Sequence, residues 1–417
     1  MKIVNSKDLN SEFFESAVVK DVESVKKILD DIRKRKDIAV KEYTKKFDNF
    51  EITNFQLTKD QINKAYSQID KKTVSALKFA AKNIRNFAKN QLKSLEDFEI
   101  NNAGVICGQR IVPIEKIGCY VPGGRYPLPS TALMTVIPAK VAGVSEVIVC
   151  SPKICPVTIV AADVAGADKI FNVGGVQAIG AMAYGTESIP KVDKIVGPGN
   201  QYVAAAKKEV YGIVGIDFIA GPSEVLIIAD DSGNPDFIAA DLLAQAEHDP
   251  SSRAEVITFS KELAEKISVS IEKQLLALKT RDIAKKSIDK NGAIILADNI
   301  NEAIEIANKR APEHLELQIK NPDTIIPKLK NYGSLFIGEY SAEVFGDYCS
   351  GPNHTLPTNG CARYTGGLSV KEYVKVLTYQ KITKEASKDL IKIASILAEV
   401  EGLFGHKNAA DIRRNEQ

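Results

Sequence analysis

The sequence predicts an α/β protein in which parallel β-sheets are covered by helices on both faces. Two observations support this fold class. From about residue 103 onward, short apolar runs rich in Val and Ile alternate with longer stretches of helical periodicity. Turns rich in Gly and Pro separate many of these runs, and short strands that are apolar along their whole length are typical of parallel sheets with two covered faces.

Helices are expected first, over residues 20 to 95. Thr58 and Gln61 have the spacing of a capping box, in which the two side chains satisfy N–H groups at the start of a helix. One apolar stripe at helical spacing follows, made of Leu77, Ala80, Ala81, Ile84, Phe87, Ala88 and Leu92. The N-terminal region is therefore predicted to consist of amphipathic helices.

Strands and helices then alternate. Strands are predicted at Val147–Cys150, Lys169–Val173, Asp193–Val196, Val225–Ala229, Glu255–Phe259, Ala293–Ala297 and Ser334–Gly338. Helices are predicted at Ala132–Ala142, Thr158–Ala165, Gln201–Tyr211, Asp236–Ala246 and Asn301–Arg310. Pro312 ends the last of these helices, and Leu315 and Leu317 then alternate as in a strand. Near the C-terminus, Thr383–Glu401 is predicted to be a long amphipathic helix.

The glycine turns suggest where ligands bind and how the chain divides. Such turns lie at 122–124, 174–175, 197–200 and 221–223, and ligands of open α/β sheets bind at the carboxyl ends of strands. We expect four parts: an N-terminal arm (1–15), one α/β domain (16–118 plus 225–367), a second α/β domain inserted into it (119–224), and a helical C-terminal arm (368–417).

Composition narrows the function classes. The net charge is +2 and lysines alternate with acidic residues, so nothing indicates nucleic acid or an anionic membrane as a partner. Residues 1–8 lack the apolar core of a signal peptide, and no apolar run is long enough to span a bilayer. The six cysteines show no CxxC pairing, which fits free thiols in a reducing compartment. The sequence predicts a soluble cytoplasmic protein.

Histidine is rare, and each of the four residues lies in a short polar motif. They are His248, His314, His354 and His406. Histidine carries protons near neutral pH and is the commonest metal ligand, so these motifs are the candidates for chemistry.

One candidate is a metal site around His248. Gln245 and His248 are three residues apart on a predicted helix and therefore share one face. With Asp347 and His406, and with the acidic neighbours of His248, they offer nitrogen and oxygen donors for zinc or a similar ion. No HExxH motif is present, and solvent-exposed histidines at helix ends fit the same spacing.

Two further patterns each leave two interpretations open. Glu313 and His314 lie side by side at a predicted helix-to-strand junction. They could form an acid–base pair, or they could be two ordinary polar residues of a surface turn. The glycine turns can present N–H groups to phosphates, or simply connect strands to helices tightly. No GxGxxG sequence follows a strand, so the usual dinucleotide fingerprint is absent.

Longer motifs occur in a specific order along the chain. They are Tyr120–Gly124, Val173–Ala178, Gly197–Asn200, Ala220–Glu224, Gln245–Asp249, Ala311–Glu316, Asp347–Tyr348, Gly351–Pro357 and Glu401–Leu403. Together they resemble the histidinol dehydrogenase family over about residues 15 to 410. That family is zinc- and NAD-dependent and catalyses the last two steps of histidine biosynthesis.

The resemblance implies roles for named residues. It assigns one zinc ion per subunit to Gln245, His248, Asp347 and His406, which also approach the substrate, and it assigns Gln245 where spacing alone would offer a carboxylate. Glu313 and His314 would be the catalytic pair, with His314 also contacting the substrate. Further substrate contacts would come from Ser223, His354 and Glu401. NAD would be held by Tyr120, Gln177 and Asn200.

The resemblance also implies a fold and an assembly. The two α/β domains would be incomplete Rossmann-like sheets, which accounts for the missing fingerprint. The protein would be a homodimer whose helical C-terminal arm reaches the partner's active site, and which of His354, Glu401 and His406 cross that interface stays open.

The implied reaction converts L-histidinol to L-histidine through a bound L-histidinaldehyde, with two hydride transfers to NAD. A related zinc- and NAD-dependent enzyme acting on another polar alcohol, such as a sulfonated propanediol, would keep the metal and the Glu-His pair. The joint presence of Ser223, His354 and Glu401 favours histidinol. A zinc hydrolase and a non-catalytic protein with a structural zinc are the more distant alternatives.

Overall fold

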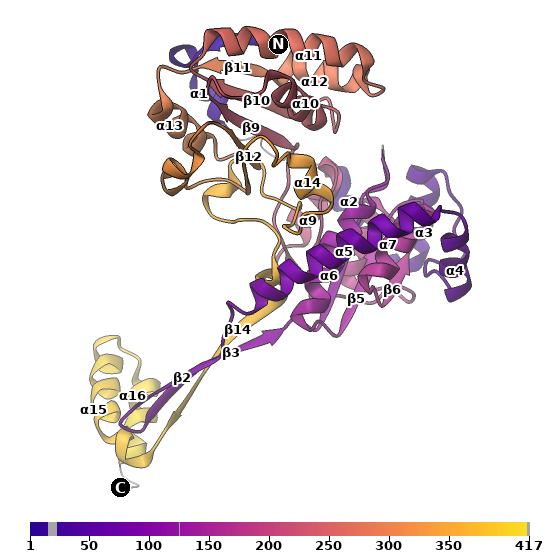
Figure 1. Cartoon of the computed structure of the whole chain (residues 1–417). Helices are drawn as coiled ribbons and strands as arrows, with labels where there is room; N and C mark the ends of the chain where they lie inside the picture. The colour runs from indigo at the N-terminus through magenta and orange to yellow at the C-terminus, as the bar shows by residue number, and fades with distance from the viewer. Residues whose placement is uncertain (16–22, 125, 415–417) are drawn as a thin grey trace. The chain divides into compact units, whose positions relative to one another are not determined.

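Figure 1 shows the computed structural model of the chain, which describes residues 1–15, 23–124 and 126–414. Residues 20–22 of the predicted helical region lie outside the described residues. The chain forms two compact units. The large unit comprises Met1–Leu92 and Ile114–Tyr373, and the small unit comprises Lys93–Pro113 and Val374–Gln417.

The first sheet of the large unit has six strands, all parallel. Their order is β1 (Lys2–Asn5), β11 (Ala293–Leu296), β10 (Arg253–Thr258), β9 (Glu224–Ala229), β12 (His314–Gln318) and β13 (Ser334–Ile337). Alternate residues of β9 pack on opposite faces. Val225 and Ile227 share a core with helices α10 (Pro235–Ala246), α11 (Lys261–Ala277) and α12 (Arg281–Asn291), whereas Leu226 and Ile228 pack against α13 (Ile300–Arg310). Both faces are therefore covered, as the apolar runs predict.

The second sheet of the large unit has five parallel strands. Their order is β6 (Lys169–Phe171), β5 (Glu146–Cys150), β4 (Lys116–Tyr120), β7 (Lys194–Val196) and β8 (Gly215–Ile216). Its own helices are α6 (Pro129–Ala142), α7 (Pro156–Ala165), α8 (Gly175–Tyr184) and α9 (Gln201–Val210). The strands and helices predicted within both sheets are confirmed, with ends displaced by up to a few residues.

The N-terminal helices pack against the helices of this second sheet. They are α2 (Glu23–Arg35), α3 (Asp37–Asp48), α4 (Lys59–Ser67) and α5 (Lys71–Leu92). Helix α2 packs on α8 and α9, α3 on α8, α4 on α7, and α5 on α6 and α7. This packing differs from the predicted grouping of residues 16–118 with residues 225–367, because an apolar stripe identifies a buried face but not its partner.

The N-terminal residues do not form the separate arm that was predicted for residues 1–15. Lys2–Asn5 is strand β1, which pairs with Ala293–Leu296 at the edge of the six-stranded sheet. Four residues are too few for strand periodicity to stand out from the surrounding sequence.

The capping box predicted at the start of α4 is confirmed. The Thr58 hydroxyl accepts from the Gln61 N–H, and the Gln61 amide oxygen accepts from the Thr58 N–H.

The small unit combines a three-stranded antiparallel sheet with two main helices. The strand order is β14 (Val374–Ile382), β3 (Val105–Pro113) and β2 (Phe98–Asn102). The predicted C-terminal helix is present as α15 (Lys384–Val400), with Thr383 as its N-cap, and α16 (Phe404–Asp411) follows it. None of the helices in the described parts of the chain is both long and apolar enough to cross a membrane.

A buried ion pair holds the turn after β7. The side chains of Lys207 and Asp217 are 3% and 0% exposed and pair with each other. Lys207 Nζ also donates to the Gly197 carbonyl at 3.0 Å, and Asp217 Oδ2 accepts from the Gly197 N–H at 2.8 Å. Gly197 itself has φ of +113°, and a Cβ there would lie 2.2 Å from the Tyr120 carbonyl oxygen, so no other residue fits. The pair therefore fixes the start of the 197–200 turn.

We expect Asp217→Asn to lower the free energy of unfolding by about 3 kcal/mol, because it leaves the Lys207 ammonium buried without a counter-charge. Urea denaturation of wild type and variant measures the difference. The double variant Lys207→Met, Asp217→Asn carries no buried charge and should be more stable than Asp217→Asn alone. A double variant that is less stable than the single variant would show that the unpaired charge is not the cause.

Candidate active site

A cavity of about 710 Å³ opens in the large unit and collects most of the predicted site residues. The turns after β4 and β7 and the segment before β9 all contribute to its wall. The cavity thus lies at the carboxyl ends of strands in the five-stranded sheet, as predicted, but at the amino ends of β9 and β12 in the six-stranded sheet. Eight predicted residues line it: Asn200, Ser223, Gln245, His248, Glu313, His314, Asp347 and His354.

His314 is the first residue of β12 and is buried, with 3% of its surface exposed. Its Nδ1 lies 3.0 Å from the backbone carbonyl oxygen of Glu224. A carbonyl oxygen only accepts, so Nδ1 carries a hydrogen and donates. The other ring nitrogen, Nε2, makes no hydrogen bond within the described part of the chain and lies 3.7 Å from Asp347 Oδ1. Nε2 is therefore the nitrogen that can give and take a proton.

Carboxylates surround the His314 ring. Nδ1 is 3.5 Å from Glu343 Oε1 and 3.8 Å from Glu313 Oε2. Burial alone lowers the pKa of His314, but Glu343, Glu313 and Asp347 outweigh burial and raise this pKa well above its usual value. A cation bound among these carboxylates would oppose their effect and return the imidazole toward its neutral, proton-accepting form.

Glu313 is buried beside His314. Its Oε2 accepts a hydrogen bond from the Glu224 N–H at 3.0 Å. Burial raises the pKa of Glu313 to about 8, although His314 and the Glu224 N–H act in the opposite direction. A carboxyl group with a pKa in this range can exchange protons near neutral pH, which suits a general acid–base residue.

Donors for a metal ion converge on the same side of the cavity. Gln245 is 0% exposed; in the amide orientation that its neighbours favour, its nitrogen donates to Glu343 and its oxygen accepts from the Glu224 N–H at 2.8 Å. Ligand atoms of His314, Glu343 and Asp347 lie within 4.8 Å of one another. These imidazole and carboxylate groups, together with exposed His248 at the cavity wall, form a donor set that suits zinc.

His354 is held by two contacts at the cavity wall. Its Nδ1 donates to the Asp347 carbonyl oxygen at 2.8 Å, and its Nε2 lies 3.2 Å from the Thr131 hydroxyl. Burial lowers the pKa of His354, against the attraction of Asp347. His354 is therefore biased toward the neutral form.

The residues expected at NAD occupy different positions. Asn200 caps α9, where its side chain accepts from the N–H groups of Tyr202 and Val203, and it lines the cavity. Tyr120 and Gln177 are buried and do not belong to the cavity wall. The Tyr120 hydroxyl accepts from the Gly175 N–H at 3.1 Å, and Gln177 Nε2 donates to Asp48 at 3.2 Å. Tyr120 therefore holds the glycine turn after β6, whereas Gln177 ties α8 to the last residue of α3.

Two predicted residues lie in the small unit. Glu401 is the C-cap of α15, and His406 is in α16. Both are exposed.

Three residues of the site were not predicted from the sequence. Glu343 lies on α14 (Glu343–Tyr348) four residues before Asp347, so the two share a helix face, and this spacing could have identified it. Glu224 acts through its backbone, which leaves no sequence signal. Arg310 is a buried cation whose partners come from two separate strands.

Comparisons with known proteins agree on one family. The model of the family described as histidinol dehydrogenase matches residues 14–414. Histidinol dehydrogenase from Methanococcus maripaludis is 52% identical, over 94% of this chain and 93% of its own length. The one from Methanocaldococcus jannaschii is 49% identical, over 98% and 94%. A crystal structure of histidinol dehydrogenase from Elizabethkingia anophelis superimposes with a TM-score of 0.92 at 40% identity, over 97% of this chain and 95% of that one. The chain therefore belongs to the histidinol dehydrogenase family of NAD-dependent oxidoreductases.

Proposed function

We propose that the protein oxidises L-histidinol to L-histidine in two successive hydride transfers, each to a separate NAD, while L-histidinaldehyde stays bound. Membership in the family supports histidinol oxidation in histidine biosynthesis. The observation that carries the mechanism is the buried pair Glu313 and His314, which faces the same cavity as Gln245, His248 and Asp347.

His314 is the base in the first oxidation. Nε2 takes the hydroxyl proton of the alcohol while the carbon-bound hydrogen leaves as hydride to NAD, which gives the aldehyde and NADH. The hydrogen bond from Nδ1 to the Glu224 carbonyl keeps the ring oriented with Nε2 toward the cavity. The same nitrogen therefore serves both oxidations.

Glu313 acts in the second oxidation. An aldehyde has no hydroxyl proton to lose, so water must first add to its carbonyl carbon and form a gem-diol. Ionised Glu313 takes a proton from that water, and protonated His314 gives the proton of the first oxidation to the aldehyde oxygen, which completes the gem-diol. Neutral His314 then takes a hydroxyl proton as the second hydride leaves to NAD. The product is the carboxylic acid, which ionises to the carboxylate, and retention of the aldehyde in the cavity prevents loss of a reactive intermediate.

We propose one zinc ion per subunit, held by Gln245, His248, Asp347 and His406. When bound, zinc supplies positions for the imidazole and amine nitrogens of the substrate. Ser223, His354 and Glu401 then recognise the polar groups of the substrate, and Tyr120, Gln177 and Asn200 hold NAD. The buried Gln245 and the part-buried Asp347, both near His314, support the metal assignment.

We also propose a cytoplasmic homodimer in which the small unit contributes Glu401 and His406 to an active site. Apolar side chains on α15 and just beyond it support an interface, since large exposed apolar patches mark contact surfaces. Those that are more than half exposed are Ile393, Ile396, Leu397, Val400 and Phe404.

We expect two NADH for each L-histidinol consumed. Chelation should abolish NADH formation, and zinc readdition should restore it. Circular dichroism before and after chelation verifies that the fold is intact. If L-histidinol gives no NADH and a sulfonated propanediol does, the substrate is the propanediol and not L-histidinol. Tight zinc binding without NAD binding would favour a hydrolase.

Glu313→Gln should slow aldehyde oxidation by about 100-fold or more and alcohol oxidation much less, because only the second step needs an activated water. Single-turnover rates with L-histidinol and with L-histidinaldehyde measure the two steps separately. Glu316→Gln removes another buried carboxyl, from strand β12 just after Glu313, and is the matched control; its two rates should keep the wild-type ratio. Equal losses in both steps of Glu313→Gln would exclude the water-activating role.

A further inference from the structure

We infer that Arg310 is a positioning residue that aligns the catalytic pair through Glu224. The inference rests on the proposed function for the roles of Glu313 and His314. Arg310 is 2% exposed, and its side chain donates to Glu255 and Glu224. Within the described part of the chain it makes no hydrogen bond to the side chain of Glu313 or His314. It acts through the residue that contacts both.

The backbone of Glu224 is that residue. Its N–H donates to Glu313 Oε2 at 3.0 Å, and its carbonyl oxygen accepts from His314 Nδ1 at 3.0 Å. The same N–H is also within 2.8 Å of the Gln245 amide oxygen. One peptide segment therefore sets the position of the base, the carboxyl group and a proposed metal ligand, so any shift of Glu224 displaces all three together.

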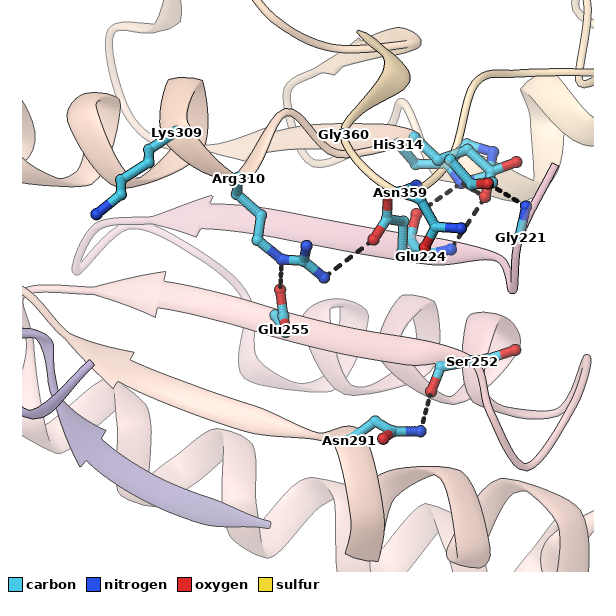
Figure 2. A network of polar contacts seen from close by, with 12 residues as sticks. Gly221, Glu224, Ser252, Glu255, Asn291, Lys309, Arg310, His314, Asn359 and Gly360 are labelled. Carbon is cyan, nitrogen blue, oxygen red and sulfur yellow. Dashed lines mark hydrogen bonds and ion pairs between the residues drawn. The ribbon is translucent and has the colours of Figure 1, made fainter. Parts of the chain in front are cut away.

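The side chain of Glu224 is held from two directions (Figure 2). Oε2 accepts from Arg310 Nη2 at 2.9 Å, and Oε1 accepts from the Asn359 N–H at 3.0 Å. Arg310 Nε donates in turn to Glu255 Oε2 at 3.0 Å. The side chains of Glu224 and Glu255 are both 4% exposed, so water does not compete with these bonds.

The location of Arg310 explains why one side chain can align both catalytic groups. Glu224 begins β9 and Glu255 lies in the neighbouring strand β10, so Arg310 ties the two strands together. Arg310 is also the last residue of α13, and the chain turns at Ala311 (φ +50°) to reach Glu313. The guanidinium thus links the start of β9 to the segment that leads into β12.

The forked guanidinium is required for this arrangement. Two of its nitrogens bind two carboxylates in different directions, whereas a lysine ammonium is a point charge on a flexible stem. Arg310→Lys keeps the positive charge but cannot hold both carboxylates in the same geometry. This substitution separates alignment from charge.

We expect Arg310→Lys to lower kcat by about 10- to 100-fold, because small misplacements of reacting groups carry penalties of this size. KM for L-histidinol and the zinc content should stay near wild type. Lys194→Met is the matched control: it breaks the part-buried 2.7 Å ion pair with Glu372, in the other sheet of the large unit from Glu224, and should reduce stability without changing kcat. An unchanged kcat in Arg310→Lys would overturn the inference.

A double variant distinguishes alignment from a general structural effect. If Arg310 acts through the catalytic pair, Arg310→Lys should lower kcat little further in a His314→Asn background, since the group that it aligns is already gone. A merely structural role predicts the same fold-loss in both backgrounds. Equal losses would therefore overturn the inference even when both variants are folded.

A measurement without turnover keeps the inference separate from the proposed function. Hydrogen exchange at the Glu224 amide should accelerate about tenfold or more in Arg310→Lys, while the Ile227 amide in the interior of β9 keeps its wild-type rate. Lys194→Met should change neither. Wild type that forms no NADH from L-histidinol contradicts the proposed function alone; an unchanged Glu224 amide contradicts the role of Arg310, whatever the substrate.

Discussion

Burial of charge is the constraint on which this active site depends. Glu224, Glu255, Glu313 and Glu343 are all nearly inaccessible to water, and the buried Arg310 and His314 offer positive charge to balance them. An unpaired buried carboxylate is costly, so each group must be protonated, paired or hydrogen-bonded. The raised pKa values of Glu313 and His314 are the result of this competition, and they suit the proton transfers proposed for these two residues.

The parallel sheet makes that burial possible. Strands β9 and β12 lie in the interior of the six-stranded sheet, and their remaining hydrogen bonds are made along the ladder with neighbours on both sides. The first residues of both strands therefore have a rigid backbone, and the N–H and carbonyl groups of Glu224 become fixed hydrogen-bond partners for the side chains of Glu313 and His314. The proposed catalytic pair is positioned by backbone geometry more than by contacts between side chains.

Sequence patterns predicted the fold class and most interior strands, because these strands are continuous apolar runs between glycine or proline turns. They did not predict β1, whose four residues carry too little pattern, nor the partners of α2 to α5. For the site, the family motifs identified eight residues that line one cavity in the structure. Spacing could have revealed Glu343 beside Asp347, but Arg310 and the backbone of Glu224 depend on strand order, which local sequence does not specify.

The small unit has a consequence for how the protein is made. Its strands β3 and β14 pair over nine residues, yet the whole 114–373 segment separates them in the chain. During synthesis β3 emerges early, and its β14 partner emerges only after the large unit has been translated. Until then β3 is an open strand edge, the kind of surface that templates association between nascent chains. Loss of the last forty or so residues would leave that edge exposed permanently, so a truncated chain should be prone to aggregation even though its large unit is complete.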